Sequence, residues 1–129
     1  MSRLHTLVAL TTLGLCTLCV PSYAQEPEAA KAKMIQALTV WAKGECAENI
    51  VSPMLLDICE QQVAANRQIL SPLGRITDAR YRGMQEMPGG LKAEAYRVEF
   101  ERGAMMWYAS LDGGGRLLVL WSNGQVRQK

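Results

Sequence analysis

Few side chains in this sequence could carry out acid–base, nucleophilic or metal chemistry, and they are unevenly placed. The chain has one histidine, His5, and four cysteines, of which Cys16 and Cys19 lie close to that histidine. We expect all three residues to be lost with an N-terminal leader, so the mature chain would keep two cysteines and no histidine. Histidine is the commonest general acid or base and a preferred metal ligand. The sequence therefore predicts no catalytic residue, no metal site and no cofactor.

Residues 1–24 have the pattern of a secretory signal peptide. Arg3 supplies a positive charge, a mostly apolar stretch runs over residues 7–20, and small residues precede a cut after Ala24. The stretch is shorter than the ~20 residues that a membrane-spanning helix needs. A lipid anchor on Cys16 or Cys19 is the alternative. We expect the mature protein in the periplasm or outside the cell.

The expected mature chain, residues 25–129, is long enough for a single domain with one modest core. The formal net charge of the whole chain is +2, and the loss of Arg3 would lower it by one. A nearly neutral chain gives no electrostatic reason to expect nucleic acid or an anionic membrane surface as a partner. We therefore predict no nucleic-acid partner and no stable membrane insertion after signal cleavage.

Cys46 and Cys59 remain as an even pair in a compartment that favours oxidation. We expect a disulfide between them, and closing such a short loop would stabilise the fold by about 3 kcal/mol. Two free thiols in the core are the alternative. Metal binding is disfavoured because neither cysteine has partner ligands nearby in the sequence.

Two helices are predicted in the first half of the mature chain. Apolar residues at helical spacing from Met34 to Ala42 predict the first helix, which ends before Gly44. Ser52 and Pro53 predict the start of the second helix, as its N-cap and first helical residue. The inner stripe of the second helix is predicted to contain Leu55, Ile58, Cys59, Gln62, Ala65 and Ile69, with Leu56, Val63 and Leu70 beside it.

From Arg75 onward, short apolar runs alternate with turns that contain glycine, a pattern typical of antiparallel hairpins. The predicted strands cover residues 76–84, 91–101, 104–111 and 116–122. The predicted fold class is therefore α+β, with two N-terminal helices packed on a curved four-stranded antiparallel sheet.

Pairing the strands about their tightest turns assigns side chains to two faces. The predicted pairs are Phe100 with Met105, Val98 with Trp107, Tyr96 with Ala109, Ala109 with Leu118, and Trp107 with Leu120. The face toward the helices then carries Tyr96, Val98, Phe100, Met105, Trp107, Ala109, Leu118 and Leu120, with Ala79 and Tyr81 beside them. On this face Tyr81 and Tyr96 are candidate cavity residues, and we find no acidic residue to accompany them.

The opposite face combines apolar and aromatic side chains with charges at its edge, which is the composition of an interface. We predict that a protein partner, or a second copy of the chain, binds Arg97, Glu99, Met106, Tyr108, Val119 and Trp121. Leu117, Arg80 and Arg82 are assigned to the same face. Cover by the chain's own tail, residues 123–129, is the alternative. A one-residue bulge would exchange part of this assignment.

Three segments carry a family resemblance: Leu73–Ile76, Ala95–Gly103 and Trp107–Gly113. They resemble small secreted bacterial proteins of the nuclear transport factor two-like, or cystatin-like, group, in which a comparable Trp-x-x-Ser-Leu-Asp segment precedes a glycine turn and the closing strand. The resemblance covers roughly residues 30–122 and implies helices packed across a curved antiparallel sheet. Members include isomerases, dehydratases, ligand binders, secretion-apparatus components and inhibitor or immunity proteins. The resemblance alone therefore does not decide the function.

Two functions from different classes follow. The first is a non-enzymatic periplasmic protein-interaction domain that acts through the exposed sheet face, as a homodimer, an inhibitor or immunity protein, or an accessory of envelope assembly. The second is a small-ligand binder, or a histidine-free isomerase or lyase, that uses the tyrosine-lined cavity. The missing histidines and the missing cavity acid favour the first.

Overall fold

Two helices precede four strands in the chain. The structure is a computed structural model and describes residues 28–125, so the predicted signal peptide lies outside the described residues. The elements are α1 (Lys31–Trp41), α2 (Pro53–Leu70), a 3-10 turn η1 (Ser71–Leu73), β1 (Ile76–Met87), β2 (Leu91–Phe100), β3 (Gly103–Leu111) and β4 (Leu117–Gln125).

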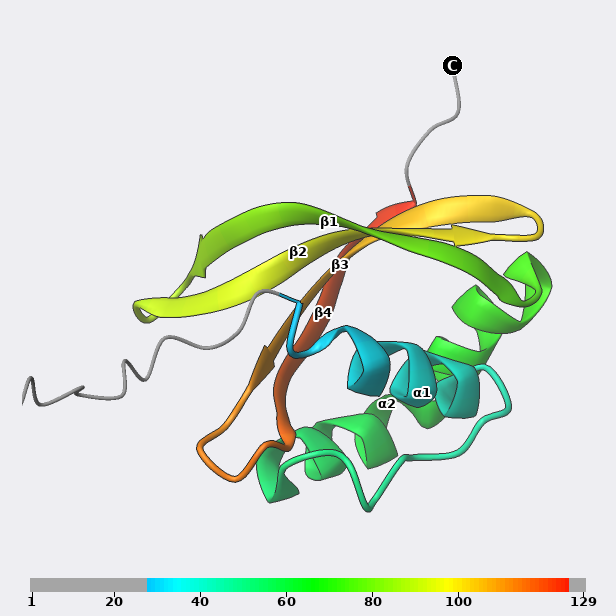
Figure 1. Cartoon of the computed structure of the whole chain (residues 1–129). Coiled ribbons are helices and arrows are strands. Elements are labelled where there is room, and N and C mark those ends of the chain that lie inside the picture. Colours follow the sequence, from blue (N-terminus) through cyan, green and yellow to red (C-terminus); the bar gives the residue numbers. More distant parts are fainter. Residues whose placement is uncertain (1–27, 126–129) are drawn as a thin grey trace, which may run out of the picture.

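The four strands form one antiparallel sheet in the order β1-β2-β3-β4. Both helices lie on the same side of the sheet, which bends around them (Figure 1). We call the side toward the helices the inner face and the opposite side the outer face. The predicted α+β class, with two helices packed on a four-stranded antiparallel sheet, is confirmed.

Both predicted helix boundaries in the connection between α1 and α2 are confirmed. The N–H of Gly44 donates to the carbonyl of Trp41 at 2.9 Å, and Gly44 has a φ of +81°, a conformation that glycine adopts without strain. At the start of α2 the hydroxyl of Ser52 accepts from the N–H of Leu55 at 3.2 Å, and Pro53 follows as the first helical residue.

The buried stripe of α2 differs from the predicted one. Leu55, Cys59 and Leu70 are buried, whereas Ile58 and Ile69 are exposed. Gln62 and Ala65 are exposed as well. The predicted stripe is too wide. The side of α2 that packs against the rest of the protein is narrower and contains residues 55, 59, 63, 66 and 70. Asn66 therefore takes a half-buried position that hydropathy alone would not assign to it.

The β2–β3 hairpin turns one residue earlier than predicted. Phe100 pairs with Gly103, Val98 with Met105 and Tyr96 with Trp107, so the predicted pairing of Phe100 with Met105 is wrong. Moving a turn by one residue shifts the pairing by two residues. Because side chains alternate with a period of two, each residue nevertheless keeps its predicted face.

The β3–β4 pairing differs from the predicted one and includes a bulge. Ala109 pairs with Leu120 and Tyr108 with Trp121, and a register shift follows between Ser110 and Leu111. The bulge turns Leu117 into the core, where it is fully buried, while Leu118 is half-buried. The predicted faces of residues 117 and 118 are therefore exchanged, which is the effect expected of one extra residue in a strand.

The connection between the helices is attached to α2 by a disulfide and to β4 by backbone hydrogen bonds. The predicted disulfide is confirmed: Cys46 and Cys59 are bonded, with their Cα atoms 6.0 Å apart. The end of the connection also joins the sheet, since Val51 forms a parallel bridge with Leu117. In that bridge the N–H of Ser52 donates to the carbonyl of Leu117, and the N–H of Leu117 donates to the carbonyl of Ile50, each at 2.8 Å.

Candidate functional site

The outer face of the sheet holds the six residues predicted to bind a partner. Arg97 pairs with Met106 across β2 and β3, and Tyr108 pairs with Trp121 across β3 and β4. The outer face also contains a small apolar cluster of its own, in which Ala93, Ala95 and Tyr108 are buried and Met87 and Met106 are partly buried. The exposed apolar surface is thus smaller than the sequence predicts, because Tyr108 is buried rather than exposed.

Trp121 is a large aromatic side chain that the outer face presents to solvent. It is 51% exposed, and its ring centroid lies 5.5 Å from that of Tyr108, with the rings tilted by 32°. Stacked aromatic pairs at this separation attract each other beyond the area that they bury. Trp121 is therefore a large apolar side chain held in place by Tyr108 yet open to solvent.

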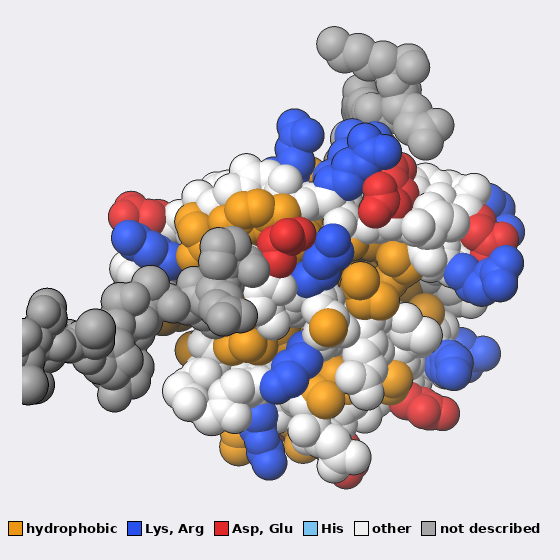
Figure 2. Space-filling model, in the orientation of Figure 1, with side chains coloured by type: hydrophobic (Ala, Val, Ile, Leu, Met, Phe, Trp, Pro, Cys, Tyr) orange, Lys and Arg blue, Asp and Glu red, His pale blue; other side chains and the backbone are white. Residues whose placement is uncertain are grey.

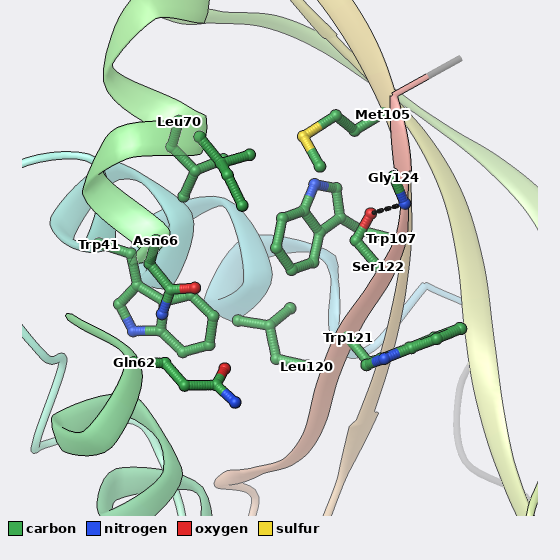
Figure 3. A pocket seen from close by; sticks show the side chains of 11 residues that line it. Trp41, Gln62, Asn66, Leu70, Met105, Trp107, Leu120, Trp121, Ser122 and Gly124 are labelled. Atoms are coloured by element: carbon green, nitrogen blue, oxygen red, sulfur yellow. Dashed lines mark hydrogen bonds between the residues drawn. The ribbon is translucent and has the colours of Figure 1, made fainter. Parts of the chain in front are cut away.

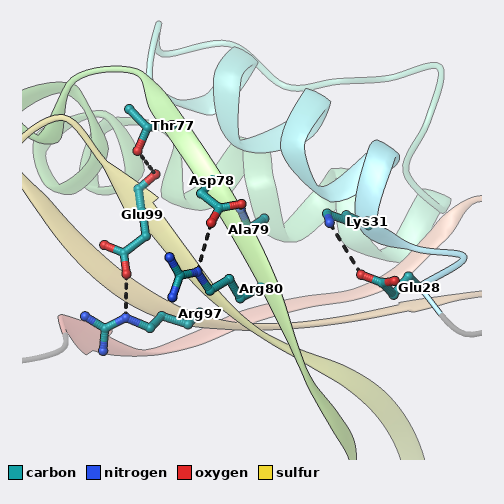
Figure 4. Close-up of polar contacts among 8 residues, drawn as sticks. All are labelled: Glu28, Lys31, Thr77, Asp78, Ala79, Arg80, Arg97 and Glu99. Atoms are coloured by element: carbon teal, nitrogen blue, oxygen red, sulfur yellow. Dashed lines mark hydrogen bonds and ion pairs between the residues drawn. The ribbon is translucent and has the colours of Figure 1, made fainter.

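Charged side chains beside this cluster neutralise one another locally. Arg80 and Arg97 are direct cross-strand partners, a like-charge arrangement that would be unfavourable by itself. Each is paired within its own strand, since Arg80 Nε lies 2.9 Å from Asp78 Oδ2 and Arg97 Nε lies 2.6 Å from Glu99 Oε1 (Figure 4). The Arg80 contact is the largest of the influences that lower the pKa of the Asp78 carboxyl.

Charges of both signs are mixed over the molecular face drawn in Figure 2, with no large area of one sign. Arg80 and Arg82 are exposed on β1, which is an edge strand, and Arg75, just before that strand, pairs with Glu101 at 3.2 Å. Exposed charges on an edge strand disfavour pairing with another chain.

The inner face contains an acidic residue that the sequence analysis overlooked. Glu94 is 2% exposed, and its Oε1 accepts from the hydroxyl of Tyr96 at 3.3 Å. The Tyr96 ring lies 5.7 Å from that of Tyr81, and Tyr96 is fully buried. The statement that no acid accompanies these tyrosines is therefore wrong. Two-residue alternation backward from Tyr96 would have placed residue 94 on the inner face.

The second carboxylate oxygen of Glu94 has a structural role. Its Oε2 accepts from the backbone N–H of Ala30 at 2.9 Å. Ala30 is the N-cap of α1, and the helix has neither a side-chain cap there nor an acidic residue in its first turn. A carboxylate from β2 thus satisfies an N–H that the helix itself leaves unpaired and lies at the end of the helix that favours negative charge.

Burial of Tyr96 predicts a measurable pH dependence. Burial, followed by the negative charge of Glu94, raises the pKa of the Tyr96 hydroxyl above its ordinary value. Folding therefore favours the protonated phenol, so the contribution of Tyr96 to the free energy of unfolding should be constant below the unfolded-state pKa of about 10 and fall as the pH rises above it. Ultraviolet difference titration should find a tyrosine that ionises late. Tyr96→Phe should remove that late step, and its persistence in the variant would contradict the assignment.

A groove lies between α2 and the last two strands, away from the predicted tyrosine cavity. It encloses about 440 Å3 and is lined by Trp41, Gln62, Asn66, Ile69, Leu70, Met105, Trp107, Leu120, Trp121, Ser122 and Gly124. We call it the tryptophan groove. The sequence predicts that Trp107 lies on the face toward the helices but does not predict its place in a groove, because no local pattern shows that α2 leaves space beside β4.

Within residues 28–125, no three His, Cys, Asp or Glu side chains lie close enough together to hold a metal ion. None of the helices in that range is long and apolar enough to cross a membrane. Comparison with known proteins finds no matching family model, no matching curated protein and no matching solved structure.

Proposed function

We propose that this chain is a non-enzymatic protein-interaction domain that acts in the periplasm or outside the cell. The observation that carries the proposal is Trp121, a half-exposed aromatic side chain on the outer face, stacked on the buried Tyr108. Met106 and Val119 lie beside this pair in the sheet, and the ion pair of Arg97 with Glu99 borders it. An aromatic anchor with a polar rim is the usual centre of a protein interface.

The partner is either a second copy of the chain or another envelope protein. Two versions of the second case are an inhibitor or immunity protein and an accessory of an envelope assembly. The order of two helices followed by four antiparallel strands also supports membership of the nuclear transport factor two-like, or cystatin-like, group. This membership is part of the proposal and has no bearing on which partner is bound.

The enzymatic alternative would use Tyr81, Tyr96 and the newly recognised Glu94. Its support is the carboxyl–phenol contact, a pairing that proton-transfer sites often use. Against it stands the hydrogen bond from Ala30 to the same carboxylate, together with the burial of both groups. We therefore retain the interaction domain as the proposed function.

Replacing the exposed tryptophan tests this proposal. We expect Trp121→Glu to weaken partner capture, or self-association, at least about tenfold, because a charge at the centre of an interface must be desolvated. The measurements are light scattering for the oligomeric state and quantitative capture from envelope extract followed by mass spectrometry. Met54→Glu is the matched control, because Met54 is an equally exposed apolar residue on α2.

The two variants separate the outcomes. Loss of the same interaction with Trp121→Glu and its retention with Met54→Glu would support the outer face as the interface. Equal binding by the wild type and both variants would rule out Trp121 as an anchor. Circular dichroism and thermal unfolding should show that both variants fold.

A further inference from the structure

The tryptophan groove joins elements that lie far apart in the sequence. Gln62, Asn66 and Leu70 come from α2, Trp107 comes from β3, and Leu120 comes from β4. Figure 3 shows their side chains converging from the helix and from the two strands. Its volume of about 440 Å3 falls in the range of cavities that hold small organic molecules.

The floor of the groove is apolar and aromatic. Trp41 and Trp107 meet edge to face, with ring centroids 6.3 Å apart and an interplanar angle of 69°. Leu70 and Leu120 are buried beside them, whereas Ile69 and Trp121 are exposed among the lining residues. The groove is therefore open to solvent at a rim that includes the polar Gln62, and it leads to a buried aromatic surface.

Three hydrogen-bond donors in the lining have no acceptor among the residues that the structure describes. They are Trp41 Nε1, Trp107 Nε1 and Asn66 Nδ2, and each atom is buried. Trp41 is only 3% exposed and Trp107 only 5%. Buried donors are almost always paired, because leaving one unpaired costs about 1–3 kcal/mol. Three such atoms around one groove indicate that its occupant supplies acceptors.

The orientation of the Trp107 ring agrees with this conclusion. In Figure 3 the indole nitrogen of Trp107 points to the side where Leu70 and Met105 lie, both of which line the groove. The hydroxyl of Ser122 is already engaged, since it donates to the carbonyl of Met106 at 2.6 Å and accepts from the N–H of Gly124 at 3.1 Å. It does not serve the indole nitrogens.

Charge limits the class of ligand further. None of the residues that line the groove carries a charged side chain. An anionic ligand would offer acceptors, but its charge would be buried without a counter-charge, which is costly. A neutral ligand with oxygen acceptors on an apolar body meets both conditions: its oxygens pair with the indole and amide donors, and its body covers the aromatic floor.

We propose that the tryptophan groove binds a neutral, amphipathic small molecule through a carbonyl, amide or ether oxygen that accepts from Trp107 Nε1, Trp41 Nε1 or Asn66 Nδ2. This site is distinct from the outer-face interface, although Trp121 borders both. The inference does not depend on the proposed protein-interaction function.

The three tryptophans of the chain all line this groove, so their indole N–H signals report on it directly. We would titrate the mature protein with octanamide and, separately, with octanoate, while recording proton–nitrogen correlation spectra. Octanamide should move the indole proton signals of Trp107 or Trp41 downfield, as expected when a hydrogen bond forms. Octanoate, which has the same chain but a negative charge, should bind at least about tenfold more weakly.

Two variants test the role of the donors. Trp107→Phe keeps an aromatic ring but removes the N–H, and we expect it to weaken octanamide binding about tenfold. Gln85→Leu is the control, because it removes an exposed amide donor on β1 outside the groove, and it should leave the affinity within about twofold. Asn66→Asp offers a second test if Trp107→Phe folds poorly. It removes a donor and adds a negative charge, and it should weaken octanamide binding as well.

The outcomes are distinguishable. Octanamide binding that shifts the indole signals and falls in Trp107→Phe supports the proposal. Equal affinity for octanamide and octanoate would overturn it, as would octanamide binding that Trp107→Phe and Asn66→Asp leave unchanged. Indole signals that no probe moves, even at saturating concentration, would show that ordered water alone satisfies these donors, and this too would overturn the proposal.

Discussion

Removing the disulfide is expected to lower the free energy of unfolding by about 3 kcal/mol. Cys46 and Cys59 are separated by 13 positions in the sequence, so the bond closes a short loop and restricts the unfolded chain. It also fastens the connection between the helices to α2, and that connection forms the bridge from Val51 to β4. For a domain of this size, the loss corresponds to a melting temperature lower by about 15 °C.

The double variant Cys46→Ala/Cys59→Ala provides the measurement by thermal or denaturant unfolding. Its control is the wild-type protein with and without reductant, because the same sequence is then compared in two redox states. Reductant should lower the melting temperature of the wild type and leave that of the double variant unchanged. If the reduced and oxidised wild type unfold at the same temperature, the bond contributes no stability.

Glu94→Ala is expected to cost about 3 kcal/mol of unfolding free energy, although Glu94 is a single carboxyl group. The substitution leaves the N–H of Ala30 and the hydroxyl of Tyr96 without their acceptor in a buried place. It also removes the negative charge at the start of α1, where the helix has no cap of its own. Denaturant unfolding measures the total effect, and hydrogen exchange should show the first turn of α1 opening more readily.

Two further variants give this prediction its controls. Glu94→Gln keeps the size and one acceptor oxygen, so it should cost clearly less than Glu94→Ala. Glu86→Ala removes an exposed acid from the same sheet and should change the stability by less than about 0.5 kcal/mol. A Glu94→Ala protein that is as stable as the wild type, or more stable, would contradict a structural role. It would favour the enzymatic alternative, because functional acids are often kept at the expense of stability.

The parts of this fold that local residues specify could be predicted from the sequence. Ser52 and Pro53 mark a helix start through contacts within one turn, and Gly44 marks an end through its own backbone conformation. The faces of the central strands could also be predicted, because alternation survives a two-residue error in pairing. The inner positions of Val98 and Trp107 are therefore as predicted despite the different hairpin turn.

The parts that depend on distant contacts could not be predicted in the same way. The inward turn of Leu117 follows from a bulge opposite β3, and no residue type near it requires that bulge. The cap of α1 comes from Glu94, which is 64 positions away from Ala30. The burial of Tyr108 depends on the outer cluster around Ala93 and Ala95. In each case the deciding partner lies on another strand, whose register must be known first.

The two edge strands of the sheet, β1 and β4, differ in what keeps a further strand from pairing with them. Along β1, exposed charges such as those of Asp78, Arg80 and Glu86 disfavour a neighbouring strand. Along β4, the bridge from Val51 already occupies the backbone of Leu117 at the first position of the strand. A fibril grows when strands are added one after another to an open edge of a sheet. The charges along β1 and the bridge at the start of β4 both disfavour the repeated strand addition that a fibril requires.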